Sequence, residues 1–180
     1  METYRLQCHG ESPPQAVTAV EARIVAVREH WLELRWRIEG AESLVVPPLA
    51  GKGRADGLWQ TTCFELFVRT PGSDAYSEFN LSPSERWAAY DFTGYREGMM
   101  NRAMPRDPVC TLRRGQGMAL FDAAVPLAGL PALPLEFSLT AVIEEQGGTK
   151  SYWAMAHGEG KPDFHDRTCF AGTLAAPGRP

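Results

Sequence analysis

The stretch HWLELRWRIEG, residues 30–40, alternates apolar and polar side chains with a period of two. Its even positions 32–38 carry Leu, Leu, Trp and Ile, whereas its odd positions 31–37 carry Trp, Glu, Arg and Arg. Successive side chains of an extended chain point to opposite faces, so this pattern predicts a strand with one buried face. The valine-rich stretch 16–27 precedes it, and we expect the two to form a hairpin through residues 28–30.

The same period governs most of the chain. Further strands are expected at 44–46, 61–68, 75–82, 86–92, 117–127, 134–145 and 150–156. Gly147 and Gly148 predict a tight hairpin between the last two, because successive glycines accept the positive φ of a primed turn. Only residues 126–133 suggest a brief helix. The fold class is therefore predicted to be mostly β, an antiparallel β-sandwich in which residues 1–180 form a single domain.

Composition narrows the class of protein. With 180 residues, 44% of them hydrophobic and 22% charged, the chain suits an ordinary globular domain. A net charge of -4 argues against nucleic acid and anionic membranes as partners. The sequence shows no apolar run of membrane-spanning length and no signal-peptide pattern, and its four cysteines are scattered. We therefore expect reduced thiols and a cytoplasmic location.

Two neighbouring predicted strands divide into two chemically different faces. Their apolar face consists of Phe64, Leu66, Val68, Phe79 and Leu81. Their opposite face consists of Glu65, Phe67, Tyr76, Glu78 and Asn80. Either Trp87 or Tyr90 extends the second face, since residues of unlike parity point apart. Rings, carboxylates and an amide suit a sugar, although a solvated sheet face carries similar cross-strand pairs.

Two motifs resemble a known family. LWQTTCFELFV (58–68) and YSEFNLSPSERWAAY (76–90) resemble the DOMON-like domains grouped with family 9 carbohydrate-binding modules. YWAMAHGEGKPDFHDRTCF (152–170) is similar to the C-terminal signature of a bacterial branch of that group. The resemblance covers residues 58–100 and 151–170. It implies a β-sandwich that binds a small ligand, preferably a sugar, on a concave face without catalysis.

The resemblance also implies a set of site residues. Trp59 matches a tryptophan ahead of the strand, Glu65 matches its acidic residue, and Arg86 matches an arginine after the Ser-Pro turn. The second clamping tryptophan would be Trp153, with Trp87 as the alternative. The expected ligand-binding residues are Trp59, Glu65, Asn80, Arg86, Trp87 and Trp153.

Two other functions stay open. Other DOMON domains bind haem b through Met and His or Lys, and Met99 and His157 are the corresponding candidates here. The other alternative is a structural or protein-interaction module without a small ligand, which would associate through its aromatic-rich face. The sequence does not indicate the oligomeric state.

Enzymatic and metal chemistry are not expected. The sequence contains no G-x-S-x-G, H-E-x-x-H or P-loop motif. Glu65 and Glu78 could form a glycosidase pair, but the sequence indicates neither a raised pKa nor a substrate cleft. The cluster His157, Asp163, His165 and Asp166 is interpreted as a hydrogen-bonded loop rather than a metal site. Residues 51–57 are interpreted as a flexible loop beside the site rather than a phosphate cradle.

Overall fold

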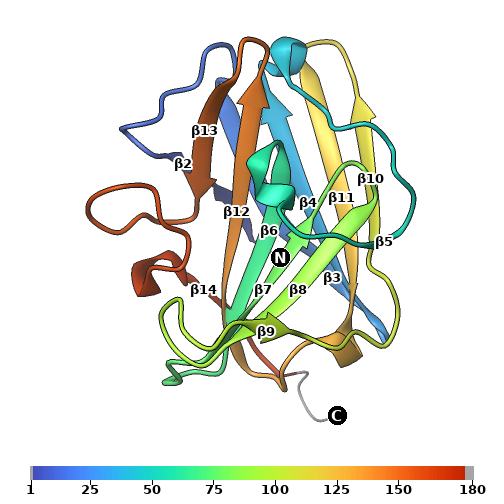
Figure 1. Cartoon of the computed structure of the whole chain (residues 1–180), viewed down its shortest axis with the longest axis vertical. Coiled ribbons are helices and arrows are strands. Elements are labelled where there is room, and N and C mark those ends of the chain that lie inside the picture. The colour runs from blue at the N-terminus through green and yellow to red at the C-terminus, as the bar shows by residue number, and fades with distance from the viewer. Residues whose placement is uncertain (1, 177–180) are drawn as a thin grey trace.

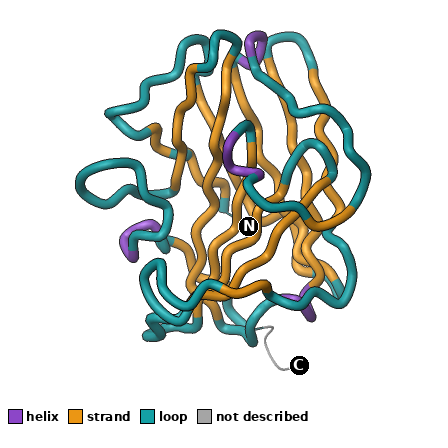
Figure 2. The backbone as a smooth tube through the Cα atoms, in the orientation of Figure 1, coloured by secondary structure: helices purple, strands orange, loops and turns teal. Residues whose placement is uncertain are grey.

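The computed structural model describes residues 2–176 and shows two β-sheets packed face to face (Figure 1). Strands dominate, and the helical segments are short turns at the ends of strands and in loops (Figure 2). These turns are η1 (Ala41–Ser43), η2 (Leu58–Gln60), η3 (Leu127–Gly129) and η4 (Arg167–Cys169). The prediction of a mostly β, antiparallel sandwich is confirmed. In the described part of the chain, no helix is long and apolar enough to cross a membrane.

The smaller sheet has five strands in the order β1-β3-β4-β11-β10, all antiparallel. Their bounds are β1 (Thr3–Arg5), β3 (Ala19–Val27), β4 (Trp31–Glu39), β11 (Met118–Pro126) and β10 (Val109–Arg114). The predicted hairpin through residues 28–30 joins β3 to β4.

The larger sheet has nine strands and follows the path β2-β13-β12-β6-β7-β8-β5, with β14 beside β12 and β9 beside β8. Its longer strands are β6 (Cys63–Arg69), β7 (Tyr76–Leu81), β8 (Arg86–Phe92), β12 (Leu135–Glu145) and β13 (Thr149–Ala154). Its short strands are β2 (Gln7–Cys8), β5 (Gly53–Arg54), β9 (Met100–Asn101) and β14 (Gly172–Leu174). Gly147 and Gly148, with φ of 95° and 86°, form the predicted turn between β12 and β13.

The core lies between the sheets. The alternation of β4 places Leu34 and Trp36 in it, and both are almost fully buried. Phe64 of the larger sheet stacks on Phe121 of the smaller one, with ring centroids 4.2 Å apart and planes inclined by 15°. Because Trp36 also packs on both of these rings, aromatic contacts hold the sheets together at the centre.

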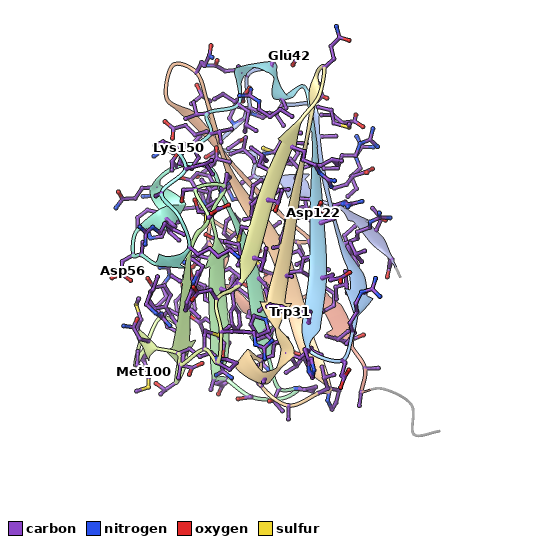
Figure 3. All side chains as sticks on the ribbon, turned by 90° about the vertical axis from the view of Figure 1, so that its right-hand side faces the viewer. Trp31, Glu42, Asp56, Met100, Asp122 and Lys150 are labelled. Atoms are coloured by element: carbon purple, nitrogen blue, oxygen red, sulfur yellow. The ribbon has the colours of Figure 1, made fainter. Side chains whose placement is uncertain are left out.

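The central strands β6 and β7 of the larger sheet are buried on both faces. Every residue of β6 and β7 is buried, although only alternate residues point into the core. The outer face carries a second apolar cluster that includes Phe67, Tyr76 and Phe92, and Phe164 and Phe170 from the C-terminal segment pack on it. This segment therefore forms a partial third layer over the outer face of the larger sheet. In Figure 3, this face is on the side where Asp56 and Met100 lie, and Trp31 and Asp122 lie on the side of the smaller sheet.

Glu145 ties the N-terminal segment to the end of β12. Its carboxylate accepts hydrogen bonds from the backbone N–H groups of Gln15 (2.7 Å), Ala16 (2.7 Å) and Val17 (3.1 Å), and from the Ser43 hydroxyl (2.9 Å). Burial by itself raises the pKa of Glu145, but these four bonds together outweigh it and lower the pKa.

We expect Leu34→Ala to lower the free energy of unfolding by about 2–5 kcal/mol, because loss of a buried leucine side chain leaves a cavity. Urea denaturation measures this change. The matched control is Glu33→Ala on the same strand, since Glu33 faces outward and pairs with exposed Arg28. Its expected cost is less than about 1 kcal/mol. Similar losses for both variants would contradict the assignment of the two faces.

Glu145→Gln should destabilise the protein at neutral pH by about 1–3 kcal/mol, because an ionised acceptor is replaced by a neutral one. The folded pKa lies below the ordinary value of 4.5, so the carboxylate stabilises the fold above that value. This contribution is lost as the pH falls through the folded pKa. Urea denaturation of both proteins from pH 7 down to about pH 3 should show the difference shrinking in acid. A stability difference between the two proteins that stays constant with pH would contradict the stabilising role of the ionised Glu145 carboxylate.

Candidate functional site

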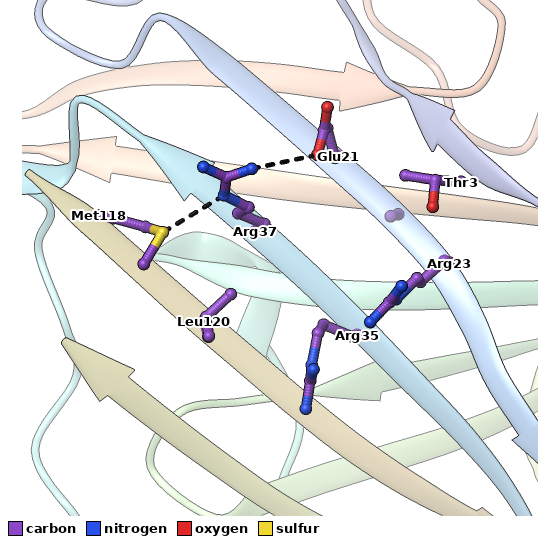
Figure 4. Close-up of a pocket in the computed structure, with 8 residues that line it drawn as sticks. Thr3, Glu21, Arg23, Arg35, Arg37, Met118 and Leu120 are labelled. Carbon is purple, nitrogen blue, oxygen red and sulfur yellow. Dashed lines mark hydrogen bonds and ion pairs between the residues drawn. The ribbon is translucent and has the colours of Figure 1, made fainter. Parts of the chain in front are cut away.

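A small hollow lies on the outer face of the five-stranded sheet (Figure 4). Its volume is about 380 Å³, and charged side chains of β3 and β4 line it. Arg37 lies 3.8 Å from Glu21, and Arg35 donates to Asp122 at 2.5 Å. These are cross-strand pairs typical of a solvated sheet face, so this hollow is not our candidate site.

The larger pocket lies on the outer face of the nine-stranded sheet and has a volume of about 940 Å³. Strands β6, β7, β8 and β12 form its floor, and three segments at 51–60, 93–101 and 152–165 form its walls. Loop 51–57 lies beside the pocket, as expected, and contributes Asp56 and Gly57. Floor and rim residues are Ser12, Trp59, Glu65, Phe67, Glu78, Asn80, Tyr90, Phe92, Arg96, Met99, Asn101, Val142, Tyr152, Lys161, Pro162, Asp163, Phe164 and His165.

The predicted division of faces is confirmed. Glu65 lies opposite Asn80 across β6 and β7, and Phe67 lies opposite Glu78. All four line the pocket, and Tyr90 rather than Trp87 extends their face on β8. Tyr90 donates a hydrogen bond of 2.5 Å to Asp56, which ties the loop to the floor.

Only one of the three proposed tryptophans lines the pocket. Trp59 lies on η2 at the rim and is 54% exposed. Trp87 and Trp153 are the end members of one row across the sheet, Trp153–Ala141–Phe64–Leu81–Trp87, and this row faces the other sheet. The structure therefore corrects the assignment of Trp87 and Trp153 to the pocket, and the adjacent Tyr152 occupies the corresponding wall.

The arginine at the pocket is not the one chosen from the motif. Arg86 begins β8, and its Nη2 donates 2.7 Å to the Ala50 carbonyl away from the lining. Arg96 lines the pocket instead and donates 2.8 Å to Asp163. Its position in a tight turn, with φ of 55°, carried no signal in the sequence that distinguished it from other loop arginines.

The two haem candidates do not meet at this pocket. Met99 lies at the exposed rim, whereas His157 is outside the lining and its Nε2 donates 2.8 Å to the Gln7 carbonyl. A Met99–His157 ligand pair therefore does not fit here. Within residues 2–176, no group of three or more His, Cys, Asp or Glu side chains could hold a metal ion. In the loop that carries His157, Asp163, His165 and Asp166, two hydrogen bonds are internal: the His165 N–H donates to Asp163 and the Thr168 N–H donates to Asp166. His157 instead bonds to Gln7 outside the loop.

Two carboxyl groups lie buried in the pocket floor. Glu65 accepts 3.0 Å from the Thr140 hydroxyl, and Glu78 accepts 2.8 Å from Asn80 Nδ2. Burial and then the proximity of Glu78 raise the pKa of Glu65 well above its ordinary range. Burial also raises the pKa of Glu78 to about 7, although the bonds from Asn80 and the charge of Arg96 oppose it. The sequence indicated neither a raised pKa nor a cleft, but the structure has a pocket whose floor carries Glu65 and Glu78, and burial raises the pKa of both.

His165 is neutral beside this pair. The Tyr76 hydroxyl oxygen accepts a hydrogen bond from the Arg96 backbone N–H at 3.2 Å and shares a second one with His165 Nδ1 at 2.7 Å. The Nε2 atom of the same ring lies 3.7 Å from a Glu78 carboxyl oxygen. Burial, followed by the charge of Arg96, lowers the pKa of His165 to about 4. At neutral pH this histidine offers Glu78 a dipole and not a positive charge.

Asn80 presents an unused acceptor. Its side chain is 1% exposed, and its Nδ2 is engaged with Glu78. Its Oδ1 has no hydrogen-bond partner among the residues that the structure describes. Buried polar atoms are usually paired, so an unpaired carbonyl in a pocket floor indicates a position for a donor from a ligand or from water.

No protein-family profile matches this chain, and no curated protein matches it in sequence. Among solved structures, a Bacteroides uniformis protein provisionally named as carbohydrate-binding aligns with a TM-score of 0.67 and 18% identity, over 97% of this chain and 85% of its own. A family 9 carbohydrate-binding module of Caldicellulosiruptor kristjanssonii, solved with cellotriose, aligns with a TM-score of 0.58 and 11% identity, over 99% and 84%. One solved with glucose aligns with a TM-score of 0.51 and 11% identity, over 97% and 86%.

These likenesses show the fold, which is a β-sandwich like that of family 9 carbohydrate-binding modules. None of the three proteins is described as a DOMON domain, so that part of the resemblance stays a prediction.

Glu78→Gln should make the protein less sensitive to alkaline pH. At pH values between the ordinary pKa of 4.5 and the folded pKa of about 7, Glu78 is ionised in the unfolded chain and largely protonated in the folded chain. Stability that is present in acid is therefore lost as the pH rises through this window. We expect the stability of Glu78→Gln relative to the wild type to rise by about 1–3 kcal/mol from pH 5 to pH 8. Urea denaturation would contradict this if the difference did not change with pH.

Proposed function

We propose that this chain binds a small carbohydrate in the pocket of the nine-stranded sheet, without catalysis. The observation that carries the proposal is the unpaired Oδ1 of Asn80 in a pocket of about 940 Å³ that has Trp59 at its rim. A sugar hydroxyl would supply the missing donor, and the apolar CH face of a sugar ring would stack on the indole. The pocket size lies in the usual range for small-molecule sites.

The walls support the same ligand class. Tyr152 and Phe164 add aromatic surface to the lining, and the exposed residues Asn101 and Lys161 add polar groups. A pocket with apolar walls and a few polar groups orients a small ligand while removing most of it from water. The solved complexes of similar fold, with cellotriose and with glucose, favour a sugar over other small ligands.

The carboxyl pair favours binding over hydrolysis. A glycosidase requires one carboxylic acid and one ionised carboxylate beside the bond that is cleaved. The pKa values of Glu65 and Glu78 are both raised by burial, so neither is a persistently ionised base at neutral pH. Glu78 is also held by Asn80 on its own strand.

A calorimetric and fluorescence titration with glucose, cellotriose and a panel of other monosaccharides tests the proposal. We expect a saturable response, with a blue shift of the exposed Trp59 emission as the ring becomes covered. Trp59→Ala should weaken binding about fivefold to tenfold, because a stacked ring contributes about 1 kcal/mol. Trp31→Phe on the other sheet is the control and should bind as the wild type does.

The absence of a response to any sugar would refute the proposal. Haem titration and solution size would then be measured on the same protein. A Soret band would favour the haem alternative, whereas concentration-dependent association would favour an interaction module.

A further inference from the structure

The floor of the pocket offers hydrogen-bond acceptors to a ligand. Asn80 Oδ1 is unpaired within the described chain, and Glu65 and Glu78 each have one side-chain donor bonded to their carboxyl groups. These three residues meet on two adjacent strands, because Glu65 is directly opposite Asn80 and Glu78 lies two residues before Asn80 on β7. Three acceptor groups thus converge on one part of the floor.

Three basic residues line the pocket, and none of them places a positive charge in contact with the two carboxyl groups at neutral pH. Arg96 is paired with Asp163, Lys161 is exposed at the rim, and His165 is neutral at physiological pH. Titratable and charged groups that face Glu78 come from β6, β7, β8, the loop that precedes η2, the 93–99 turn and the C-terminal segment. They are Glu65, Tyr76, Tyr90, Asp56, Arg96, Asp163 and His165.

We propose that the ligand carries a primary ammonium group, as an amino sugar does, and that this group is seated against Glu65, Glu78 and Asn80 Oδ1. The inference rests on the proposed function, since it names the class of carbohydrate that the same pocket takes. A primary ammonium has three N–H donors and no acceptor, which matches three converging acceptors. A single hydroxyl has only one donor and could bond to only one of these three groups.

Electrostatics favours the same choice. Burial keeps these two neighbouring carboxyl groups protonated or partly protonated, because their charged forms are costly away from water. A seated ammonium would stabilise their ionised forms through charge-assisted hydrogen bonds. The rings of Phe67, Tyr90 and Phe92 around the floor would add cation–π attraction.

The proposal makes binding proton-linked. When the ammonium lowers the carboxyl pKa values, the pocket must release protons near neutral pH. A neutral sugar would not drive such a release. The number of protons exchanged therefore distinguishes the two ligand classes independently of affinity.

The test is isothermal titration calorimetry of the full chain with glucosamine, N-acetylglucosamine and glucose. Each titration is run near pH 7 in two buffers of different ionisation enthalpy, which gives the number of protons released. We expect glucosamine to bind at least about tenfold more tightly than the other two, with net proton release for glucosamine alone.

Variants locate the ammonium. Glu78→Gln should weaken glucosamine binding about tenfold or more and abolish most of the proton release, whereas glucose binding should weaken by a smaller factor. Glu39→Gln removes a carboxylate from the end of β4 on the other sheet. It is the matched control and should change the affinity for neither glucosamine nor glucose. Far-UV circular dichroism and urea denaturation confirm that both variants are folded.

The outcomes separate this inference from the proposed function. Equal affinities for glucose and glucosamine, without proton release, would overturn the ammonium and leave sugar binding intact. Tight binding of N-acetylglucosamine as well as glucosamine would also overturn it, because the amide has no charge. If Glu78→Gln binds glucosamine as tightly as the wild type does, the proposed position of the ammonium group on this floor is wrong. Failure of all sugars to bind would overturn both proposals.

Discussion

The contact on which the rest of the structure depends is the aromatic packing at the centre of the sandwich. Phe64 stacks on Phe121 across the two sheets, and Trp36 packs against both. Because side chains alternate along β6, anchoring Phe64 in the core turns Glu65 and Phe67 to the opposite side. The pocket floor is thus a direct consequence of how the two sheets pack.

The outer face of the larger sheet combines two opposing requirements. Phe67, Tyr76 and Phe92 pack under the C-terminal segment as a second apolar cluster, whereas Glu65 and Glu78 are buried among them. Within residues 2–176, neither carboxyl group forms an ion pair with an arginine or a lysine. Buried carboxyl groups weaken the fold at neutral and alkaline pH. A structure that keeps such groups in a pocket is consistent with a role in ligand recognition, since buried, strongly perturbed groups concentrate at functional sites.

Much of the site followed from strand periodicity. Alternation puts Glu78 and Asn80 on one face of their strand, and the apolar residues of both strands predict that Glu65 shares this face. Parity within one strand does not say which face of that strand meets the core. Trp87 is paired with Leu81 and Trp153 with Ala141, and both of these partners face the other sheet. The register between strands therefore decides that both tryptophans point into the core.

The sequence by itself determined the fold class, the hairpins at 28–30 and at Gly147–Gly148, and the shared face of Glu65, Phe67, Glu78 and Asn80 in the pocket floor. These features depend on local alternation and turn chemistry, which a single chain segment contains. Only the tertiary structure decided that Arg96 and His165 join the pocket and that burial raises the pKa of Glu65. Exposure, hydrogen bonding and desolvation depend on which distant segments pack together, and residues 93–99 and 155–170 reach the floor only in the folded chain.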